Sequence, residues 1–351
     1  MYAPFLGQAN LCCRRYGAPH PLAESRTMLR LRYAGPRGTA ASVRRLIVAV
    51  TAAATALALA ACATAGAGST SQTGTARTIT HELGETAITG TPGRVVALEF
   101  SFVQALDALG VQPVGIADDD DADRIRQLLG APIEYTSVGT RLEPNLELVS
   151  SLSPDLIIAD LTRHTAIVPQ LKQIAPTIVL NSWEGSYQDI KDAVVTIADA
   201  LDDRTKGEQV VAQHEARIKE LAARIPDGED RRFLLAVATP DAMSLHTSAA
   251  FSGSVFQALG LSAAVTADDA VESGVGIERL LDVDPDVLFV ATDGPGTVFE
   301  QWQKNSAWSS MSAVAKGSVF NVDRNQYARF RGLQTAETIA ADIVQNVVGE
   351  R

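Results

Sequence analysis

The chain has 351 residues, of which 46% are hydrophobic and 20% are charged, and its net charge at neutral pH is −11. This composition is that of a globular protein of about two domains, and it excludes a largely disordered chain. Residues 1–61 carry eight arginines and one glutamate, so the remainder is strongly acidic. An acidic surface argues against nucleic acid as a partner, because nucleic acids are bound by basic surfaces.

An export signal is the first recognisable element of the chain. A basic stretch at residues 43–45 precedes an apolar run that extends from Leu46 to Leu59. Such a segment is typical of a cleaved secretory signal and is too short to span a membrane. Cys62 follows small residues at the expected cleavage point, which resembles the bacterial lipobox and implies that Cys62 carries a lipid. The alternative is a plain signal peptide with a chance cysteine.

The segments on either side of this signal show no core-forming pattern. We expect residues 1–27 to be disordered and to precede the true start of translation, at Met28 or later. The signal then occupies residues 28–61, and the small and polar residues 62–78 form a flexible tether. Since Cys62 is the only cysteine from Met28 onward, the mature protein has no internal disulfide and no cysteine metal site.

Residues 79–203 alternate between short apolar runs and helical patterns. Ser101 and Gln104 have the spacing of a capping box, so a helix is expected to begin there, directly after the first strand. The alternation predicts an α/β lobe with a largely parallel sheet. Strands are predicted at Val95–Leu98, Val111–Ile116, Leu156–Ala159 and Thr177–Leu180, and further helices at residues 145–152 and 165–174.

The second half of the chain, residues 227–351, repeats features of the first. The interval from Glu147 to Pro154 equals the interval from Glu278 to Pro285, and an aspartate and an apolar run follow each proline. Repetition of this kind predicts two α/β lobes.

Residues 204–226 separate the two halves. Thr205 and Glu208 have capping-box spacing, and apolar residues lie on one helical face before Pro226. We expect a single long helix that crosses from lobe to lobe and limits hinge motion between them. The alternative is an ordinary crossover helix within one large sheet.

No catalytic motif is found in the sequence. It has no Walker A loop, nucleophile elbow, zinc-binding His-Glu helix, EF-hand loop or Gly-x-Gly-x-x-Gly sequence, and its histidines are scattered. The absence of these motifs therefore gives an enzyme no support, although it does not exclude one.

Arginines are concentrated in three stretches, which we expect at strand ends, where open α/β sheets bind ligands. Guanidinium groups bind carboxylates bidentately, and the helix N-terminus at Ser101 adds backbone donors. For each arginine the alternative is a solvated charge that pairs with one of the many acids. The stretches contain Arg141, then Arg163 with His164, then Arg329 and Arg331.

A series of short motifs extends from about residue 79 to the C-terminus. They are Val96–Phe102, Pro113–Asp119, Val138–Arg141, Glu143–Glu147, Pro154–Asp160, Arg163-His164, Ile174–Pro176, Val322–Arg324 and Arg329–Gly332. These motifs resemble the substrate-binding proteins of iron-siderophore ABC importers, most closely the branch that binds iron(III) dicitrate. The likeness is dense in the first lobe and thinner in the second until residue 319.

This resemblance implies two Rossmann-like lobes joined by a helix, the class III periplasmic-binding-protein fold, with a ligand cleft between the lobes. It implies a monomeric, extracytoplasmic protein, anchored through lipidated Cys62, that delivers iron(III) dicitrate or a similar anionic ferric siderophore to a permease with ATPase subunits. No cofactor is expected, and the chelator holds the iron. A hydroxamate or catecholate siderophore, or haem, is the alternative cargo. An exported hydrolase that uses Asp118 and Asp160, and an adhesion or sensory module, are the rival classes.

The resemblance also implies roles for individual residues. Arg141 meets the chelate, and residues of both lobes complete the binding site. Glu147 and Glu278, one on each lobe, are expected to dock arginines of the permease. The other expected ligand contacts are Arg163, His164, Ser101, Phe102, Trp183, Tyr327, Arg329 and Arg331, with Trp183 either a cleft wall or a core aromatic.

An unbroken acidic run, Asp118–Asp121, departs from the family pattern, which usually continues with an asparagine. Acids repel an anionic ligand. We expect the run to be a solvated loop at the rim of the cleft, balanced by Arg124 and Arg126.

Overall fold

The computed structural model describes residues 76–348. The predicted export signal, Cys62 and most of the predicted tether lie outside the described residues. In the part that is described, no helix is both long and apolar enough to cross a membrane.

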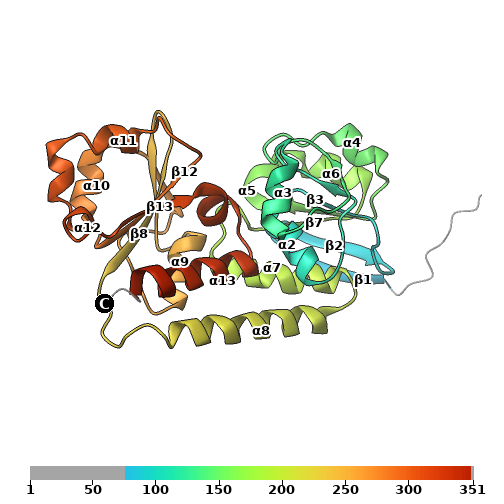
Figure 1. Ribbon diagram of the computed structural model, residues 1–351. Helices are drawn as coiled ribbons and strands as arrows, with labels where there is room; N and C mark the ends of the chain where they lie inside the picture. The colour runs from blue at the N-terminus through green and yellow to red at the C-terminus, as the bar shows by residue number, and fades with distance from the viewer. Residues whose placement is uncertain (1–75, 349–351) are drawn as a thin grey trace, which may run out of the picture. The chain divides into compact units, whose positions relative to one another are not determined.

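The first lobe is built on a five-stranded parallel sheet with the order β5-β4-β3-β6-β7 (Figure 1). The strands are β3 (Val95–Ala97), β4 (Gly115–Ile116), β5 (Thr136–Ser137), β6 (Leu156–Asp160) and β7 (Thr177–Leu180). The helices are α2 (Phe100–Ala108), α3 (Ala122–Leu129), α4 (Leu146–Ser151), α5 (Leu161–His164) and α6 (Val168–Ile174), with a short helix η1 (Thr165–Ile167). The predicted parallel sheet is confirmed, although the strand expected at Val111–Ile116 covers only its last two residues.

The apolar runs form strands because both faces of this sheet are buried. Successive side chains of β6 point to opposite faces, so Leu156 and Ile158 join one hydrophobic cluster, whereas Ile157 and Ala159 join another. All five residues of β6 are buried.

Two local predictions at the start of this lobe are wrong. The predicted tether ends too late, because β1 (Ala76–His81) pairs with β2 (Gly84–Thr89) as an antiparallel hairpin. Helix α2 begins at Phe100 and has Glu99 at its N-cap position without a side-chain cap, so Ser101 and Gln104 do not form a capping box.

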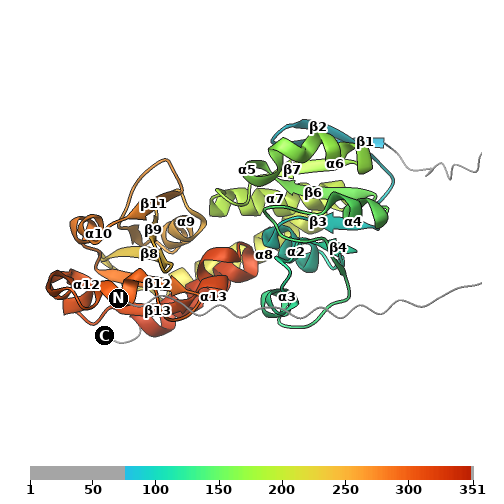
Figure 2. The same cartoon turned by 90° about the horizontal axis from the view of Figure 1, so that it is seen from above.

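The second lobe has a mixed sheet with the order β11-β9-β8-β12-β13, and β10 pairs with β8 (Figure 2). Strands β8, β12, β13 and β10 are parallel, whereas β9 is antiparallel to β8 and β11. The strands are β8 (Arg232–Ala238), β9 (Met243–His246), β10 (Ser262–Ala263), β11 (Val271–Val275), β12 (Val287–Thr292) and β13 (Val319–Asp323). The helices are α9 (Phe251–Ala258), α10 (Ile277–Val283), α11 (Val298–Trp302), α12 (Ser312–Ala315), η2 (Ser306–Ser310), η3 (Asn325–Arg329) and η4 (Ile343–Val348).

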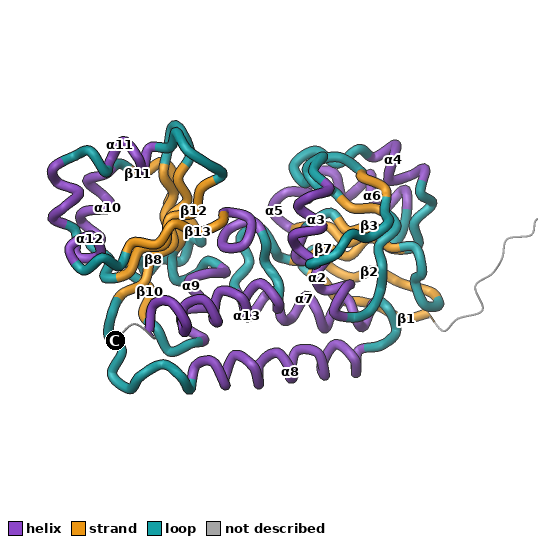
Figure 3. Tube along the Cα trace, viewed as in Figure 1, coloured by secondary structure: helices purple, strands orange, loops and turns teal. Residues whose placement is uncertain are grey.

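Helix α8 (Arg204–Ala222) carries the chain from the first lobe to the second, as predicted (Figure 3). Its N-cap is Asp203, whose side chain accepts a hydrogen bond from the Lys206 amide, so the predicted capping box at Thr205 is wrong. Two further helices, α7 (Tyr187–Ala200) and α13 (Leu333–Asp342), pack along it.

Helices α7 and α13 also link the two hydrophobic cores. In α7, Ile190 packs in the core of the second lobe and Ile197 in the core of the first. In α13, Leu333 packs in the first core and Ile339 in the second. Because three packed helices join the lobes, the connection is stiffer than the single helix that was expected.

Candidate functional site

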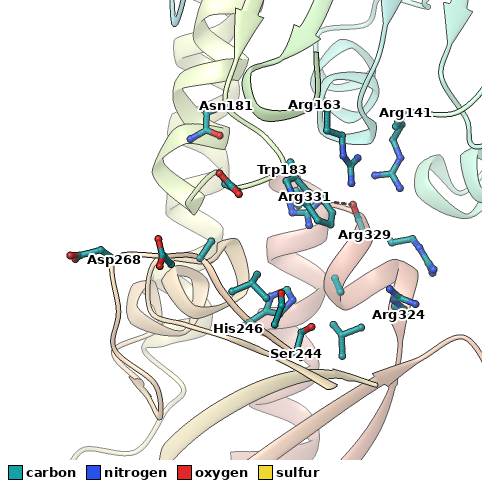
Figure 4. A pocket seen from close by; sticks show the side chains of 17 residues that line it. Arg141, Arg163, Asn181, Trp183, Ser244, His246, Asp268, Arg324, Arg329 and Arg331 are labelled. Atoms are coloured by element: carbon teal, nitrogen blue, oxygen red, sulfur yellow. Dashed lines mark hydrogen bonds between the residues drawn. The ribbon is translucent and has the colours of Figure 1, made fainter. Parts of the chain in front are cut away.

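A cavity of about 750 Å³ opens between the two lobes (Figure 4). Loops that follow strands of both sheets supply many of its lining residues, where α/β sheets place ligands. Five arginines line the cavity. They are Arg141, Arg163, Arg324, Arg329 and Arg331. The expected convergence of Arg141, Arg163 and Arg331 on one cleft is therefore found, and Trp183 lines the same cavity.

Arg141 is held by two carboxylates on the wall of the first lobe. Its Nη2 lies 2.7 Å from Asp119 Oδ2, and its Nη1 lies 3.3 Å from Glu99 Oε2. Burial alone would lower the pKa of the Arg141 guanidinium, but the neighbouring Glu99 and Asp119 carboxylates raise it. Arg141 is only 5% exposed, so most of its charge is satisfied inside the protein.

The acidic run positions Arg141, contrary to the expectation of a solvated loop. Asp118 is buried and accepts hydrogen bonds from Tyr135 Oη at 2.7 Å and from Ser137 Oγ at 2.5 Å. Asp119 has a φ of 61°, a left-handed conformation that non-glycine residues seldom adopt. Arg124 balances the charge of the acidic run as expected, because its Nη1 lies 3.1 Å from Asp119 Oδ2. Arg126 instead pairs with Asp123.

Trp183 connects arginines of the two lobes. The guanidinium carbon of Arg163 lies 3.9 Å from the centre of the indole ring, and that of Arg331 lies 4.6 Å from it. Such cation–π contacts stabilise arginine charges over an aromatic ring. Because 37% of Trp183 is exposed and it lines the cavity, it is a cleft wall rather than a core aromatic.

Arg331 is the cavity arginine whose positive charge is least balanced by neighbouring carboxylates. Its side chain is buried, and its Nη1 donates to the Arg329 carbonyl oxygen at 3.3 Å. Among the described residues it forms no ion pair within 4.0 Å. Burial, with a smaller effect of the charges of Arg141 and Arg163, lowers its pKa to about 10. A buried guanidinium without a carboxylate partner is the group that an anionic ligand would satisfy best.

Arg324 and Arg329 share one carboxylate. Nη1 of Arg324 and Nη2 of Arg329 each lie 2.6 Å from Asp293 Oδ2. Hydrogen bonding to Arg329 is the main cause that lowers the pKa of Asp293 to about 2. Four of the five arginines are thus paired with three carboxylates, Glu99, Asp119 and Asp293, and Arg331 with none of them, which leaves a surplus of two positive charges on this side of the cavity.

The opposite side of the cavity is acidic and accepts hydrogen bonds. Glu184, Asp268 and Asp269 are among the lining residues of the cavity, and Figure 4 shows Asp268 and Asn181 on the far side of Trp183 from Arg141. The Oδ1 atom of Asn181 is buried and has no hydrogen-bond partner among the described residues. The cavity is therefore polarised, and its arginine side is the part suited to an anion.

Four predicted ligand contacts lie outside the lining of this cavity. Ser101 is buried and its Oγ lies 2.7 Å from Ser182 Oγ, while Phe102 is fully buried in the core. Tyr327 is buried in the core of the second lobe, and its hydroxyl donates to Asp342. These three side chains are used in packing and hydrogen bonds within the protein and do not line the cavity.

His164 is the fourth residue, and it supports the site from behind. Its Nδ1 accepts from the Asp160 amide and its Nε2 contacts the Arg141 carbonyl oxygen, both at 2.8 Å. Burial is the main cause that lowers its pKa, so the neutral ring donates from Nε2. His164 fixes the backbone of Arg141 instead of lining the cavity.

The carboxylates considered for a hydrolase are also used structurally. Asp160 is fully buried, and its side chain accepts from the amides of Arg163, Ser182 and Trp183 at 2.8 to 2.9 Å. Neither Asp160 nor Asp118 lines the cavity. In residues 76–348, no group of three or more histidine, cysteine, aspartate or glutamate side chains is arranged to hold a metal ion.

Arg324, Asn181 and His246 are lining residues that the sequence alone did not identify. Arg324 lies in a quoted motif, beside Arg329 and Arg331, so its charge was a usable signal. His246 offered no signal, since no neighbouring histidine or acid accompanies it in the sequence.

His246 makes folding pH-dependent. Its Nδ1 lies 3.1 Å from Ser252 Oγ, and burial, then the charges of Arg331 and Arg324, lower its pKa from 6.5 to about 3. Below pH 6.5 the unfolded chain therefore binds a proton that the folded protein does not bind, so stability falls as the pH falls toward 3. Between pH 7.5 and pH 5 we expect the wild type to lose about 1–2 kcal/mol more unfolding free energy than His246→Asn. Urea unfolding at both pH values measures this, and equal losses would contradict it.

The two predicted docking acids occupy matching places in the two lobes. Glu147 and Glu278 are both exposed, in the first turns of α4 and α10. Neither forms an ion pair with another described residue within 4.0 Å.

Comparison with known proteins identifies related chains. A family model described as "Periplasmic binding protein" matches residues 95–325. The chain is 46% identical over 277 residues to the Fe(3+)-citrate-binding protein YfmC of Bacillus subtilis, covering 79% of this chain and 88% of the relative. It is 37% identical over 271 residues to the Fe(3+) dicitrate-binding periplasmic protein FecB of Escherichia coli, covering 77% and 90%.

Solved structures share the fold. The Staphylococcus aureus protein SirA, in complex with staphyloferrin B, superposes with a TM-score of 0.67 at 22% identity, covering 77% of this chain and 97% of SirA. The petrobactin-binding protein YclQ of Bacillus subtilis gives a TM-score of 0.66 at 22% identity, covering 77% and 98%. The expected two-lobed fold is confirmed, and the chain belongs to the periplasmic binding protein family.

Proposed function

We propose that this protein is the extracytoplasmic solute-binding component of an ABC importer and that its ligand is iron(III) dicitrate or a similar anionic ferric siderophore. The observation that carries the proposal is the buried guanidinium of Arg331, which forms no ion pair with a carboxylate of residues 76–348, in a cavity with four more arginines. Two relatives with 46% and 37% identity are named for binding Fe(3+)-citrate and Fe(3+) dicitrate, which supports the same ligand class.

The arginine side of the cavity suits a chelate whose own oxygens hold the metal. In ferric citrate, carboxylates and hydroxyls of the ligand coordinate the iron and leave negative charge on the outside of the complex. Guanidinium groups bind such carboxylates with two parallel hydrogen bonds and remain charged when they are partly buried. The protein therefore needs to supply neither an iron ligand nor a cofactor, and binding involves no catalytic step.

Titration of tryptophan fluorescence with ferric citrate tests this function. Trp183 lines the cavity, so a bound iron chelate should quench its emission at concentrations well below millimolar. Trp183→Phe is the control for emission from Trp302 and Trp308, which lie outside the cavity lining. Absence of quenching below millimolar, together with no thermal stabilisation, would count against the function.

Competing cargoes are ranked by thermal stabilisation. Hydroxamate and catecholate siderophore chelates, and haem, are compared with ferric citrate at equal molar excess. The ligand with the highest affinity raises the melting temperature most. We expect the order to favour ferric citrate, because the arginine side of the cavity has a positive surplus and guanidinium groups bind the carboxylates of citrate bidentately.

The permease-docking role of Glu147 and Glu278 is part of the proposal. Both acids are exposed and unpaired in the described structure, one on each lobe, so together they can report whether the cleft is closed. We expect Glu147→Lys and Glu278→Lys to bind ferric citrate normally but to lower ligand-stimulated ATPase activity of the reconstituted importer by about tenfold or more. Glu85→Lys, at an exposed site on β2, is the charge-matched control. Unchanged stimulation in both variants would exclude docking through these acids.

Membrane attachment through Cys62 completes the proposal. Cys62 lies outside the described residues, and its role rests on the small residues and apolar run that precede it. Relatives in the same family include a putative ABC transporter substrate-binding lipoprotein, YhfQ of Bacillus subtilis. Cys62→Ser should release the protein from the membrane fraction without changing ligand binding, and retention of the variant in that fraction would contradict lipid anchoring.

A further inference from the structure

Glu99 is a buried carboxylate directly behind the arginine wall of the cavity. It is 1% exposed, does not line the cavity and lies at the N-cap position of α2. Its two oxygens accept from two different arginines: Oε2 from Arg141 Nη1 at 3.3 Å, and Oε1 from Arg163 Nη1. One carboxylate therefore joins the arginines that follow β5 and β6.

The two arginines depend on Glu99 to different extents. Arg141 has a second partner in Asp119, which lies 2.7 Å from its Nη2. Within residues 76–348, Arg163 forms an ion pair with Glu99 alone. Its guanidinium carbon also lies 3.9 Å from the centre of the Trp183 ring. The direction of the Arg163 side chain thus follows from Glu99 on one side and the indole on the other.

Glu99 also reduces the positive charge that a ligand meets. With Glu99, Asp119 and Asp293 ionised, the five arginines have a surplus of two charges, and without Glu99 the surplus is three. At the short distances of this site, and in the low dielectric of a buried wall, one charge changes the attraction of an anion substantially.

We propose, on the basis of the function proposed above, that Glu99 is a positioning residue that aims Arg163 into the cavity and limits the positive charge offered to the ferric chelate. It sets how strongly the cavity discriminates between chelates by their charge. A residue that served only to stabilise the fold would change affinity for all ligands alike and leave the electrostatic part of binding unaltered.

Two substitutions separate charge from geometry. Glu99→Gln keeps the shape and removes the charge, whereas Glu99→Asp keeps the charge but is too short to bridge both arginines. Glu134→Gln removes an exposed carboxylate outside the cavity lining and is the matched control. Dissociation constants for ferric dicitrate are measured from Trp183 quenching at ionic strengths of about 0.02 M and about 0.5 M.

The salt dependence of the dissociation constant would not change if Glu99 had a purely structural role. We expect the ratio of the dissociation constant at high salt to that at low salt to be about threefold larger in Glu99→Gln than in the wild type. Loss of the Glu99 carboxylate leaves one more uncompensated positive charge, whose attraction for the chelate is screened at high salt. Glu99→Asp should bind about tenfold more weakly with the wild-type ratio, since it keeps the charge and loses one charge-assisted hydrogen bond. Glu134→Gln should match the wild type in both.

The outcomes distinguish this proposal from the proposed function. A wild type that does not bind ferric dicitrate overturns the proposed function. A wild type that binds, together with an unchanged salt ratio in Glu99→Gln, overturns the charge-limiting role. If Glu99→Gln fails to fold, Glu99→Asp still decides the positioning role, because wild-type affinity in that variant would overturn it.

Discussion

Arg141→Ala should lower the free energy of unfolding by about 3–5 kcal/mol, the range found when one partner of a buried ion pair is removed. The substitution removes one of the two arginine partners of the buried Glu99, which keeps Arg163, and of the partly buried Asp119, which keeps Arg124, so the lower end of this range is expected. It also removes the cation–π contact in which the Arg141 guanidinium lies 3.9 Å from the centre of the Phe100 ring. Urea denaturation of the ligand-free protein, followed by circular dichroism, measures the change.

Arg126→Ala is the control for this prediction. Arg126 pairs with Asp123 on the exposed face of α3, with side chains that are 61% and 78% exposed. Such surface pairs contribute about 0–1 kcal/mol, so the control should unfold nearly as the wild type does. If Arg141→Ala cost less than about 1 kcal/mol but abolished ferric citrate binding, Arg141 would be mainly a ligand contact, as the sequence alone suggested.

Elements with a strong apolar signature were predictable from the sequence. Leu156–Ala159 is a continuous apolar run, and such runs form strands buried on both faces of a parallel sheet. The crossing by α8 followed from the position of a long helical segment between two repeated halves. Arginines at strand ends were predictable as a group, because parallel strands bring their carboxyl ends to one edge of the sheet.

The partners of those arginines were not predictable. Asp119 reaches Arg141 only because the backbone at Asp119 and Asp120 is left-handed, and no side-chain pattern encodes that conformation for aspartate. Glu99 looked like one more acid in an apolar stretch, yet long-range folding places it between two arginines. Pairings between distant residues depend on the tertiary structure, and sequence spacing carries no information about them.

The direction of a side chain could not be predicted even for a residue next to a cavity-lining one. His164 follows Arg163 in α5, but successive residues on a helix point about a hundred degrees apart, so His164 turns inward to the Arg141 backbone. In the second lobe, β11 has a partly exposed, weakly apolar sequence, and its antiparallel pairing with β9 had no signature in the pattern. Proximity in sequence to a cavity-lining arginine therefore does not imply a place in the cavity lining.

Arg331→Met should raise the stability of the ligand-free protein and weaken ferric citrate binding at the same time. The guanidinium is buried and has no carboxylate partner in the part of the chain that the structure describes. Replacing a buried charge with an apolar side chain of similar length is expected to add about 1–3 kcal/mol to the unfolding free energy. The same change removes a charge-assisted contact to the chelate, which should weaken binding by about 1.5–3 kcal/mol. Thermal denaturation and Trp183 quenching measure the two effects separately.

Opposite signs of these two effects are what identify Arg331 as a group held in place for its ligand. A structural arginine would give a less stable variant, whereas a solvated one would change neither quantity. Arg331→Lys refines the interpretation, because lysine keeps the charge but cannot stack its planar group on Trp183 or bind a carboxylate bidentately. Binding between that of the wild type and that of Arg331→Met is expected for this variant. A less stable Arg331→Met protein with unchanged affinity would show that the positive surplus on the arginine side of the cavity is not used for an anionic ligand.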